Sequence, residues 1–519
     1  MAKALYFVGP WDLNPSFPCV PKAPDEGSIV LVESLAKGAT LPYHRKKLVL
    51  VLSALHHFAE ELREEGFDVH VVRAPTYLEG IAAQAKRLGA REIVAMQPRE
   101  WGLHQQMIQA QKDKVFGVPL RLCEDGGSED LPFLISRADF ATWAKGKKQL
   151  RLDQFYAWMR KRSGWLMAGS EPLGGRFSFD SDNRQRVRDE IPPPRPHYPP
   201  DETTRAIMER VATWKGRWGE VEGFDWPVTR EQALAELDDF LRARAVGFGP
   251  FQDAMVEGDP FLWHSRLSSS LNLGLLTPHE VCKRALDAFA AGRMPIASAE
   301  GFLRQIMGWR EYVRGAYWQR MPQMRHANQL EAHRPLPRFY WEPEQSEMAC
   351  MRDSVKQVHD HGYAHHIQRL MVLGNFALLA GIEPIELSHW FWAAFIDAYE
   401  WVELPNVHGM ALWADAGFTT KPYAASGAYI DRMSDYCKGC PYDVKKRTGP
   451  QACPFNPLFW AFLEKHRAKV ENNPRIRALY RTWDRWPESE RHAIRASAAE
   501  VLARLSPSDY PWRFHDDQA

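Results

Sequence analysis

The first 135 residues alternate between short apolar runs and longer amphipathic stretches. Short apolar runs of a length that suits a buried β-strand occur at residues 4–9, 29–33, 69–72, 92–96 and 120–122. Apolar positions repeat at helical spacing over residues 43–66, 77–88 and 100–115. Strands that alternate with helices form a parallel sheet with helices on both faces, so we expect an α/β, Rossmann-like domain at residues 1–135. There is no GxGxxG motif, so this is not an obvious dinucleotide-binding domain.

Residues 136–230 have the pattern of a connector. Residues 155–163 favour a helix, and the proline run at 192–200 is typical of an extended, exposed linker. Arg184 lies near aromatic residues, a pattern that suits either a phosphate contact or a solvated loop. Strand signals fade after residue 230, and we expect an all-helical domain at residues 231–519. Its helices are expected at residues 231–246, 277–291, 298–321, 345–380, 384–399 and 456–468.

The composition is that of an ordinary globular protein with an unusual load of aromatic side chains, among them 20 Trp. Tryptophans at this density serve cores, stacking platforms or electron relays. The net charge is +1, so any contact with nucleic acid must come from a local basic patch. The N-terminal apolar run is too short for a signal peptide, and no apolar run has the length of a membrane span. We therefore expect a cytoplasmic protein without a membrane segment.

Four of the seven cysteines lie in one region, Cys350, Cys437, Cys440 and Cys453. Cys437 and Cys440 form a C-x2-C pair that lets two thiolates reach one metal centre, and we expect Gly439 to relax the backbone between them. The four thiolates suit either tetrahedral zinc or an iron–sulfur cluster. Structural zinc sites more often have two such pairs, so the single pair favours a cluster over zinc and over four ordinary buried thiols. Cysteines without a disulfide framework fit a reducing compartment.

A serine-rich segment at 261–272 follows a glycine-containing stretch at 247–253, which we expect to be a loop. Hydroxyl and backbone N–H groups at a helix start suit a pyrophosphate, although serine there also serves as an ordinary cap. Further along, Gln305, Trp309 and Arg310 are spaced to lie near one helix face. An amide, an indole and a guanidinium can contact a flat aromatic cofactor or nucleotide; a surface ion pair beside a core tryptophan has the same pattern.

Two adjacent histidines, His365 and His366, precede Arg369 in a segment that we expect to be helical. His366 and Arg369 are three residues apart and so share a helix face. Adjacent histidines can tune each other's pKa, which suits proton donation, and they also occur in purely structural roles.

Three carboxylates lie among residues 397–403. Burial of an unpaired carboxylate is costly, so we expect some of them to pair with a cation such as Arg369. Lys421 lies close to Tyr423 in the segment Thr-Lys-Pro-Tyr, and a cation beside an aromatic ring is compatible with a nucleotide contact.

Together these segments resemble the iron–sulfur bacterial cryptochromes and photolyases, also called prokaryotic (6-4) photolyases, of the cryptochrome/photolyase superfamily. The segments that carry the resemblance are Phe-Leu-Trp-His-Ser-Arg-Leu-Ser at 261–268, Gly-Trp-Arg-Glu-Tyr-Val-Arg-Gly at 308–315, Ala-His-His-Ile-Gln-Arg-Leu-Met at 364–371, Tyr-Glu-Trp-Val-Glu-Leu-Pro-Asn-Val at 399–407, Thr-Lys-Pro-Tyr at 420–423 and the cysteine pattern. The resemblance is specific from about residue 245 to 460 and weaker before residue 130.

The resemblance implies an N-terminal antenna domain, a connector and a helical domain that binds FAD in a folded form. It implies that Cys350, Cys437, Cys440 and Cys453 bind a [4Fe–4S] cluster. The residues that it implies for FAD are His264, Ser265, Leu267, Ser268, Leu271, Gln305, Trp309, Arg310, Arg369, Asp397, Glu403 and Asn406. Arg369 and Asp397 are expected as the ion pair beside the flavin, with Glu403 facing the flavin N5.

The activity implied is light-driven repair of (6-4) pyrimidine–pyrimidone photoproducts in damaged duplex DNA, by electron transfer from reduced FAD to a flipped-out lesion. His365 and His366 are the implied catalytic residues, with His366 supplying a proton. The implied contacts to DNA or the lesion are Arg184, Lys421 and Tyr423, and the implied electron relay is Trp390 and Trp341. A blue-light photoreceptor of the same fold is the alternative, and a flavin-free zinc or iron–sulfur protein explains the cysteines alone. We expect a bacterial monomer.

The chain departs from the family pattern at a few positions. Residues 9–13 read Gly-Pro-Trp-Asp-Leu where many relatives have Gly-Asp-Gln-Leu, a turn that helps to hold a lumazine antenna. Whether a lumazine binds stays open, because Trp11 is large enough to fill the site whereas Glu33 matches a possible antenna contact. Phe391 stands where tyrosine is common, which predicts a missing relay step, and His408 is unusual near the flavin edge.

Overall fold

The computed structural model describes residues 3–187, 190–415, 417–419 and 421–508, so Thr420 of the predicted Thr-Lys-Pro-Tyr segment lies outside the described residues. Its N-terminal part is a parallel sheet in the order β3-β2-β1-β4-β5. The strands are β1 (Ala4–Phe7), β2 (Gly27–Ser34), β3 (Asp68–Ala74), β4 (Glu92–Met96) and β5 (Leu120–Cys123). The helices around them are α1 (Leu35–Ala39), α2 (Arg45–Glu64), α3 (Tyr77–Leu88) and α4 (Trp101–Lys112).

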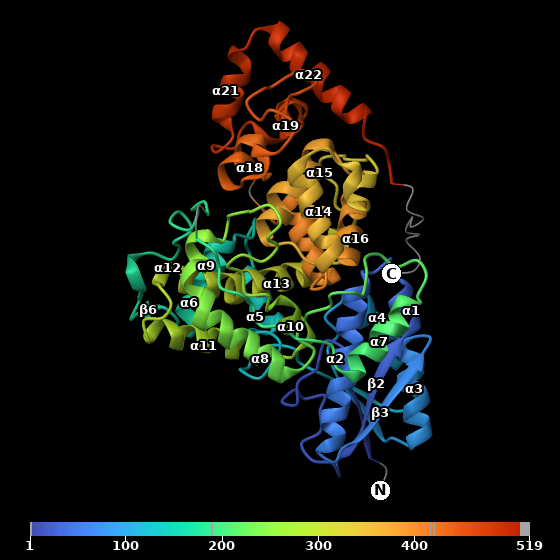
Figure 1. The fold of residues 1–519 in the computed structure, drawn as a ribbon. Helices are drawn as coiled ribbons and strands as arrows, with labels where there is room; N and C mark the ends of the chain where they lie inside the picture. Colours follow the sequence, from blue (N-terminus) through green and yellow to red (C-terminus); the bar gives the residue numbers. More distant parts are fainter. Residues whose placement is uncertain (1–2, 188–189, 416, 420, 509–519) are drawn as a thin grey trace.

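Alternation along the strands explains how the sheet is covered on both faces. Leu5 and Phe7 of β1 belong to one buried cluster, which also contains Ile81 of α3 and Met107 of α4. Tyr6, between them, belongs to the larger core, which takes in the apolar face of α2. Successive side chains of a strand point to opposite faces, so one strand serves two layers. The predicted α/β fold is confirmed (Figure 1).

The connector contains more structure than the sequence predicted. It forms α5 (Arg137–Ala144), α6 (Leu152–Ser163), the hairpin β6 (Met167–Ala168) and β7 (Glu171–Pro172), and α7 (Glu202–Ala212). The proline run is not an exposed linker, because Tyr198 is buried and the Arg195 side chain is only 11% exposed. Prolines keep this segment out of helices and sheets, but the side chains between them dock it onto the helical part.

The remainder of the described chain is helical, as predicted. Its α-helices are α8 (Arg230–Asp239), α9 (Ala245–Phe251), α10 (Ser268–Leu273), α11 (Pro278–Ala290), α12 (Ile296–Leu303), α13 (Glu311–Arg320), α14 (Ala349–His361), α15 (Asn375–Ala380), α16 (Pro384–Ala394), α17 (Glu400–Glu403), α18 (Gly427–Met433), α19 (Phe455–Lys465), α20 (Arg467–Val470), α21 (Arg477–Arg485) and α22 (Glu488–Ala503). Its π-helical segments are η2 (Phe240–Arg244), η3 (Arg304–Arg310), η7 (Gln368–Gly374) and η8 (Leu404–Ala411). Its short 3₁₀ turns are η4 (Gln323–His326), η5 (Arg338–Tyr340), η6 (Pro343–Gln345) and η9 (Tyr436–Lys438), and the connector contains one more, η1 (Leu173–Gly175).

Two predicted elements differ in kind from those observed. The helix expected over 345–380 is broken, because Gly362 ends α14 in the left-handed conformation at φ 65° and residues 363–365 are not helical. This break places His365 in a short irregular stretch rather than inside a continuous helix. The loop expected over 247–253 is mostly α9, which tolerates Pro250 near its end. The domain boundaries at 135 and 230 stay a prediction.

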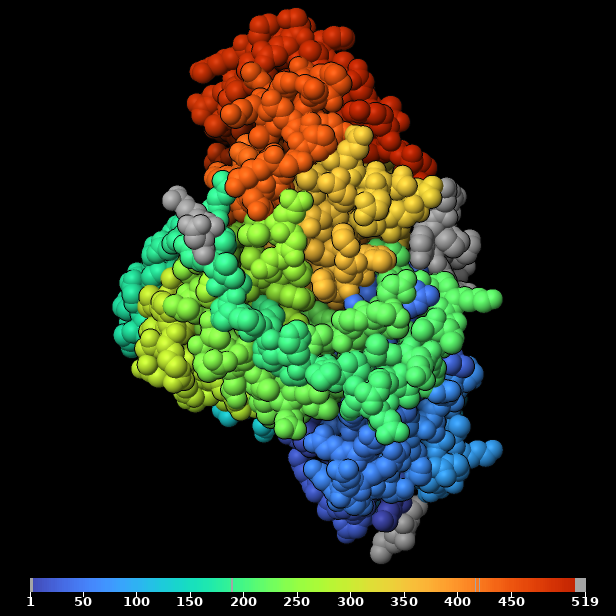
Figure 2. Space-filling view, viewed as in Figure 1, coloured from blue at the N-terminus to red at the C-terminus, as the bar shows by residue number. Residues whose placement is uncertain are grey.

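The sheet lies at one end of the molecule and the C-terminal helices α18 to α22 form the other (Figures 1 and 2). Three π-helical segments, η3, η7 and η8, hold predicted site residues, and such local distortions of a helix are frequent at functional sites. Among the described residues, no helix combines the length and the apolar character needed to cross a bilayer.

Candidate functional site

The segment 261–268 adopts an irregular backbone that the connector holds in place. Leu262 and Arg266 both have positive φ, at 43° and 58°, which is uncommon for residues other than glycine. Asp259 caps the start of the segment, because its Oδ1 accepts the backbone N–H groups of Phe261 at 3.0 Å and Leu262 at 2.9 Å. Such strained backbone persists only where the surroundings fix it.

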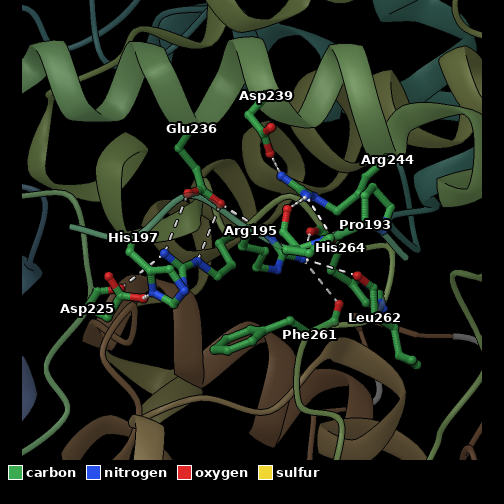
Figure 3. A network of polar contacts seen from close by, with 12 residues as sticks. Pro193, Arg195, His197, Asp225, Glu236, Asp239, Arg244, Phe261, Leu262 and His264 are labelled. Atoms are coloured by element: carbon green, nitrogen blue, oxygen red, sulfur yellow. Dashed lines mark hydrogen bonds and ion pairs between the residues drawn. The ribbon is translucent and has the colours of Figure 1, made fainter. Parts of the chain in front are cut away.

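Figure 3 shows the polar contacts that hold the backbone of this segment. Arg195 donates to the carbonyls of Phe261, Leu262 and His264, and its Nη1 lies 3.1 Å from Glu236. Glu236 is fully buried, and its carboxylate also forms an ion pair with Arg266, a residue of the segment, at 3.4 Å. Burial, and then the charge of Arg266, lower the pKa of Arg195 to about 10, which leaves the guanidinium charged at neutral pH. One carboxylate therefore ties the connector and the site segment together.

The structure brings three histidines to one place. The rings of His264 and His365 stack with centroids 4.7 Å apart and planes 12° apart. Burial, and then the neighbouring His264, hold the pKa of His365 well below its ordinary value. His366 follows with its ring exposed, yet desolvation by the surrounding protein and the charge of Arg369 lower its pKa to about 4. At pH 7 these imidazoles are neutral, and each has one N–H to donate.

The predicted ion pair is present. Arg369 Nη1 lies 3.0 Å from Asp397 Oδ1 and Nη2 lies 3.1 Å from Oδ2, a bidentate geometry. Ser268 donates its hydroxyl to Asp397 Oδ2 at 2.6 Å, and Arg369 Nε donates to the Ala364 carbonyl at 2.6 Å. Although burial opposes ionisation, the Arg369 charge holds the pKa of Asp397 below its ordinary value. The pair joins the histidine segment to the start of α10.

Three of the other predicted cofactor residues donate hydrogen bonds to neighbouring helices. Arg310 reaches α10 and donates to the Leu271 carbonyl at 3.2 Å and to Asn272 Oδ1. Gln305 of η3 donates to the Gly301 carbonyl of α12, and Asn406 of η8 donates to the Val402 carbonyl of α17. Of the remaining three, Ser265 and Trp309 are half-buried, and Leu267 is buried directly before α10.

Glu403 is a buried carboxyl with an unusual protonation preference. Burial raises its pKa to about 8, although the charges of Arg369 and Lys47 act in the opposite direction. Lys47, which is also buried, donates to the carbonyls of Trp392 at 2.6 Å and Ala398 at 2.5 Å. Glu403 is therefore largely a neutral acid at pH 7, able to donate a hydrogen bond.

The four predicted cluster cysteines line one cavity. Cys350 comes from the first turn of α14, Cys437 from η9, and Cys453 from just before α19. Burial, followed by the charges of the other three thiolates, raises the pKa of Cys350 well above its ordinary value, as expected for neighbouring thiols. Among the described residues, no three His, Cys, Asp or Glu side chains gather as they would around a single metal ion.

Glycine is required at a different position in this cavity from the one predicted. Gly439 has φ −102°, which any residue adopts, and a Cβ there would meet no atom within 4 Å. Gly427, at the start of α18, lines the cavity, and a Cβ there would lie 2.8 Å from Cys453 Sγ. The expectation for Gly439 is therefore wrong, and Gly427 is the glycine that the cysteine cavity needs.

A hydrogen-bonded link joins the cysteine cavity to the histidines. Tyr436 lines the cavity, and its hydroxyl accepts a hydrogen bond from Gln368 Nε2 at 2.9 Å and donates to Asp353 at 2.9 Å. Gln368 Oε1 in turn accepts the backbone N–H of His365 at 3.1 Å. The position of His365 therefore depends on the structure around the cysteines.

The predicted relay tryptophans are separated by a third one. The Trp390 ring lies 6.4 Å from Trp218, and Trp218 lies 5.6 Å from Trp341, between ring centroids. The Trp390 ring also packs against the Phe395 ring, with centroids 5.6 Å apart. The Arg369 guanidinium lies 4.2 Å from the centroid of the Phe395 ring. The rings thus form a path from the ion pair to Trp341, and Trp218 of the connector is its middle member.

The predicted DNA contacts lie near one another. Lys421 Nζ is 5.4 Å from the Tyr423 ring centroid. Burial, and then the charges of Arg475 and Arg184, lower the pKa of Lys421. Arg184 is exposed and pairs with Asp180. Two cations therefore lie near the Tyr423 ring, and one of them, Arg184, also pairs with Asp253.

The two positions that bear on an antenna are both occupied by protein contacts. Trp11 is 6% exposed, and Glu33 is buried. The basic side chains that bind Glu33 are His56 (2.6 Å), Arg73 (2.8 Å) and Arg210 (3.0 Å). Glu33 thus has a structural role here, and lumazine binding stays a prediction.

Comparison with known proteins gives consistent matches. Residues 7–226 match the family model described as "Deoxyribodipyrimidine photo-lyase-related protein". A (6-4) photolyase of Agrobacterium fabrum (strain C58 / ATCC 33970) is 43% identical over 489 residues, which cover 92% of this chain and 95% of the relative.

Solved structures share the fold. A bacterial class III photolyase from Agrobacterium tumefaciens superposes with a TM-score of 0.58 at 16% identity, over 83% of this chain and 86% of that one. A cryptochrome from Synechocystis sp. PCC6803 gives a TM-score of 0.55 at 14% identity, over 83% of this chain and 88% of that one. At these identities the two structures establish the fold alone.

Proposed function

Because this chain belongs to the bacterial (6-4) photolyase family of the cryptochrome/photolyase superfamily, as its motifs predicted, we propose that it repairs (6-4) pyrimidine–pyrimidone photoproducts in DNA by a light-driven reaction. The observation that carries the proposal is the placement of His365 and His366 beside the bidentate Arg369–Asp397 pair. Two proton-bearing rings and a fixed guanidinium meet where the family binds its cofactor and lesion.

FAD is the cofactor of the family, and the residues of this chain fit it. Several of the buried polar atoms without a partner among the described residues lie on the predicted stretches: His264 Nε2, the hydroxyls of Ser269 and Ser270, Arg310 Nε and both ring nitrogens of His365. Buried polar groups normally have a hydrogen-bond partner, so these atoms are available to a bound molecule. FAD supplies light absorption and one-electron transfer when bound.

The chain's own residues would position that cofactor. His264, Ser265 and Ser268 would hold its polar parts at the start of α10, where backbone N–H groups favour an anion. Arg369, fixed by Asp397, would present its guanidinium to the ring system, and Glu403 would donate a hydrogen bond as a neutral acid. Leu267, Leu271, Gln305, Trp309, Arg310 and Asn406 would complete the enclosure.

The two histidines would share the proton chemistry. Both are neutral at pH 7, so a histidine that donates a proton to the lesion would first take one up from solvent. His366 is exposed and can take up that proton from water, whereas His365 is buried against His264. We therefore assign proton donation to His366 and orientation of the lesion to His365.

The four cysteines would bind a [4Fe–4S] cluster. They line one cavity, and cluster iron is held by four thiolates. The ligands come from α14, from η9 and the residues directly after it, and from the segment before α19, so the cluster would join these elements. Through Tyr436 and Gln368 it would also support His365.

The remaining predicted residues would bind the damaged DNA and supply electrons to the cofactor. Arg184, Lys421 and Tyr423 would contact the damaged duplex, with two cations for phosphates and a ring for a flipped base. Trp390, Trp218 and Trp341 would relay electrons to the cofactor.

A repair assay tests the proposal. Photoreduced protein and an oligonucleotide with one (6-4) lesion are illuminated, and the products are separated by chromatography. We expect restoration by the wild type, strong loss in His366→Ala, and no loss in His492→Ala, which changes an exposed histidine on α22. Flavin that photoreduces without any repair would instead favour a photoreceptor.

A further inference from the structure

One face of α21 presents a row of arginines. Its other face is buried through Tyr480 and Trp483, which are 3% and 2% exposed. Arg477, Arg481 and Arg485 are all exposed and follow one another at every fourth residue. In an α-helix this spacing puts three side chains within an arc of about 80° and along about 12 Å of the axis. The row is therefore a narrow basic stripe held on a rigid element.

The stripe has no counter-charge of its own. The one acidic side chain of α21, Asp484, is held by Arg467, whose Nη1 and Nη2 lie 2.7 and 2.8 Å from its carboxylate oxygens. Within the part of the chain that the structure describes, no ion pair engages the three arginines of the stripe. Long basic side chains without partners keep their full charge for a ligand.

The helix is anchored rather than loosely attached. Trp483 stacks on Trp460 of α19 at 5.9 Å between ring centroids, and the Tyr480 hydroxyl donates to the Leu463 carbonyl at 2.7 Å. The C-terminal helices form one end of the molecule (Figures 1 and 2). An arginine row on an anchored helix keeps its geometry when a partner arrives.

The stripe continues the predicted DNA-contact surface. Arg475, exposed and two residues before α21, is close enough to Lys421 and Tyr423 for its charge to act on both side chains. The connector also reaches this region, because Arg186 donates to the Ser434 carbonyl at the end of α18. A basic path thus leads from the lesion contacts onto α21.

We propose that the exposed face of α21 binds the phosphate backbone of duplex DNA flanking the lesion. The proposal rests on the proposed function and adds a second contact area to it. Duplex DNA carries one negative charge per about 1.7 Å of its axis, so phosphates are available to each arginine of a stripe of this length. Contacts of this kind fix the position of the duplex and carry no sequence preference.

The test measures binding of a long undamaged duplex between about 50 and 200 mM salt. The variant is Arg477→Gln/Arg481→Gln/Arg485→Gln. The matched control removes three exposed positive charges from α3 and the end of α4, as Lys86→Gln/Lys112→Gln/Lys114→Gln. Each lost phosphate contact lowers the slope of log K against log salt by roughly 0.9, so we expect a decrease of about 2 to 3 in the variant and none in the control.

An arginine-to-lysine triple variant at the same positions keeps the charge, and we expect it to keep most of the slope. A wild-type slope in the glutamine variant, or an equal decrease in the control, overturns the proposal. Repair is measured in parallel: at saturating lesion duplex the glutamine variant should turn over like the wild type, with a raised KM. A slope change without repair by the wild type refutes the proposed function alone; repair with an unchanged slope refutes this inference alone.

Discussion

Replacement of Gly427 by alanine tests the cluster site through a single methyl group. Gly427 begins α18 and lines the cavity of the four cysteines. An added Cβ would lie 2.8 Å from Cys453 Sγ and 3.0 Å from a Val444 methyl group. Its backbone N–H is already fixed by Asn456 Oδ1 at 3.1 Å, so the helix start cannot easily withdraw.

The size of the displacement follows from these distances. Ordinary contacts of a Cβ begin at 3.4 Å, so the sulfur or the helix must move by roughly 0.6 Å. Metal–ligand distances tolerate about 0.2 Å, so a shift of this size removes Cys453 from a cluster. Overpacking itself costs about 1–3 kcal/mol, which a protein of this size survives, so loss of the cluster should exceed loss of the fold.

The assay is iron and acid-labile sulfide per chain, together with flavin content and the thermal unfolding midpoint. We expect purified Gly427→Ala to contain less than half of the wild-type iron and sulfide and to keep its flavin. The matched control is Gly439→Ala, at a position with φ −102° where a Cβ meets nothing within 4 Å. It should keep iron and sulfide at the wild-type ratio.

If Gly427→Ala holds as much iron and sulfide as the wild type, a Cβ at this position does not displace Cys453. Equal loss in both glycine variants would contradict the role of crowding at Gly427, because only this position is crowded. Zinc without sulfide in the wild type would show that the thiolates hold a single ion instead.

Three further variants test other parts of the site. Asp397→Asn leaves the Arg369 charge buried without its partner, so we expect about 3–5 kcal/mol of destabilisation and weak flavin retention, measured by thermal shift with and without added FAD. The pKa of Glu403 is about 8 in the folded protein and near the ordinary 4.5 in the unfolded chain, so stability falls as pH rises between these values. Glu403→Gln should flatten that fall in the unfolding midpoint of flavin-free protein, and an unchanged pH profile contradicts the assignment. Trp218→Phe should slow photoreduction of the bound flavin several-fold, whereas Trp165→Phe, whose ring packs on His279 away from the relay, should not.

The fold could be predicted from the sequence where the pattern is local. The strands of the sheet and the helix Tyr77–Leu88 follow from apolar spacing and from turn residues that end each element. The break between α14 and η7 could not be seen, because apolar residues continue through it and only the left-handed Gly362 marks it. The docking of the proline run was hidden for a different reason: Arg195 is buried by carbonyls that lie far away in the sequence.

Some features of the site could be predicted from the sequence and others could not. The ion pair of Arg369 and Asp397 could be predicted, since a buried carboxylate needs a cation and the family motif supplies one. Trp218 and Gln368 could not, because their roles arise from neighbours contributed by other elements. The sequence points to Gly439 because it lies between two cysteines, whereas only the packing around Cys453 shows the need for glycine at 427.

Light-driven repair is tested by a comparison of light and dark with purified protein, an electron donor and a duplex carrying one (6-4) lesion. We expect that blue or near-ultraviolet light restores the two original pyrimidines, that darkness does not, and that removal of the flavin abolishes the reaction. A flavin-loaded, reduced protein that leaves the lesion intact in light would contradict this expectation.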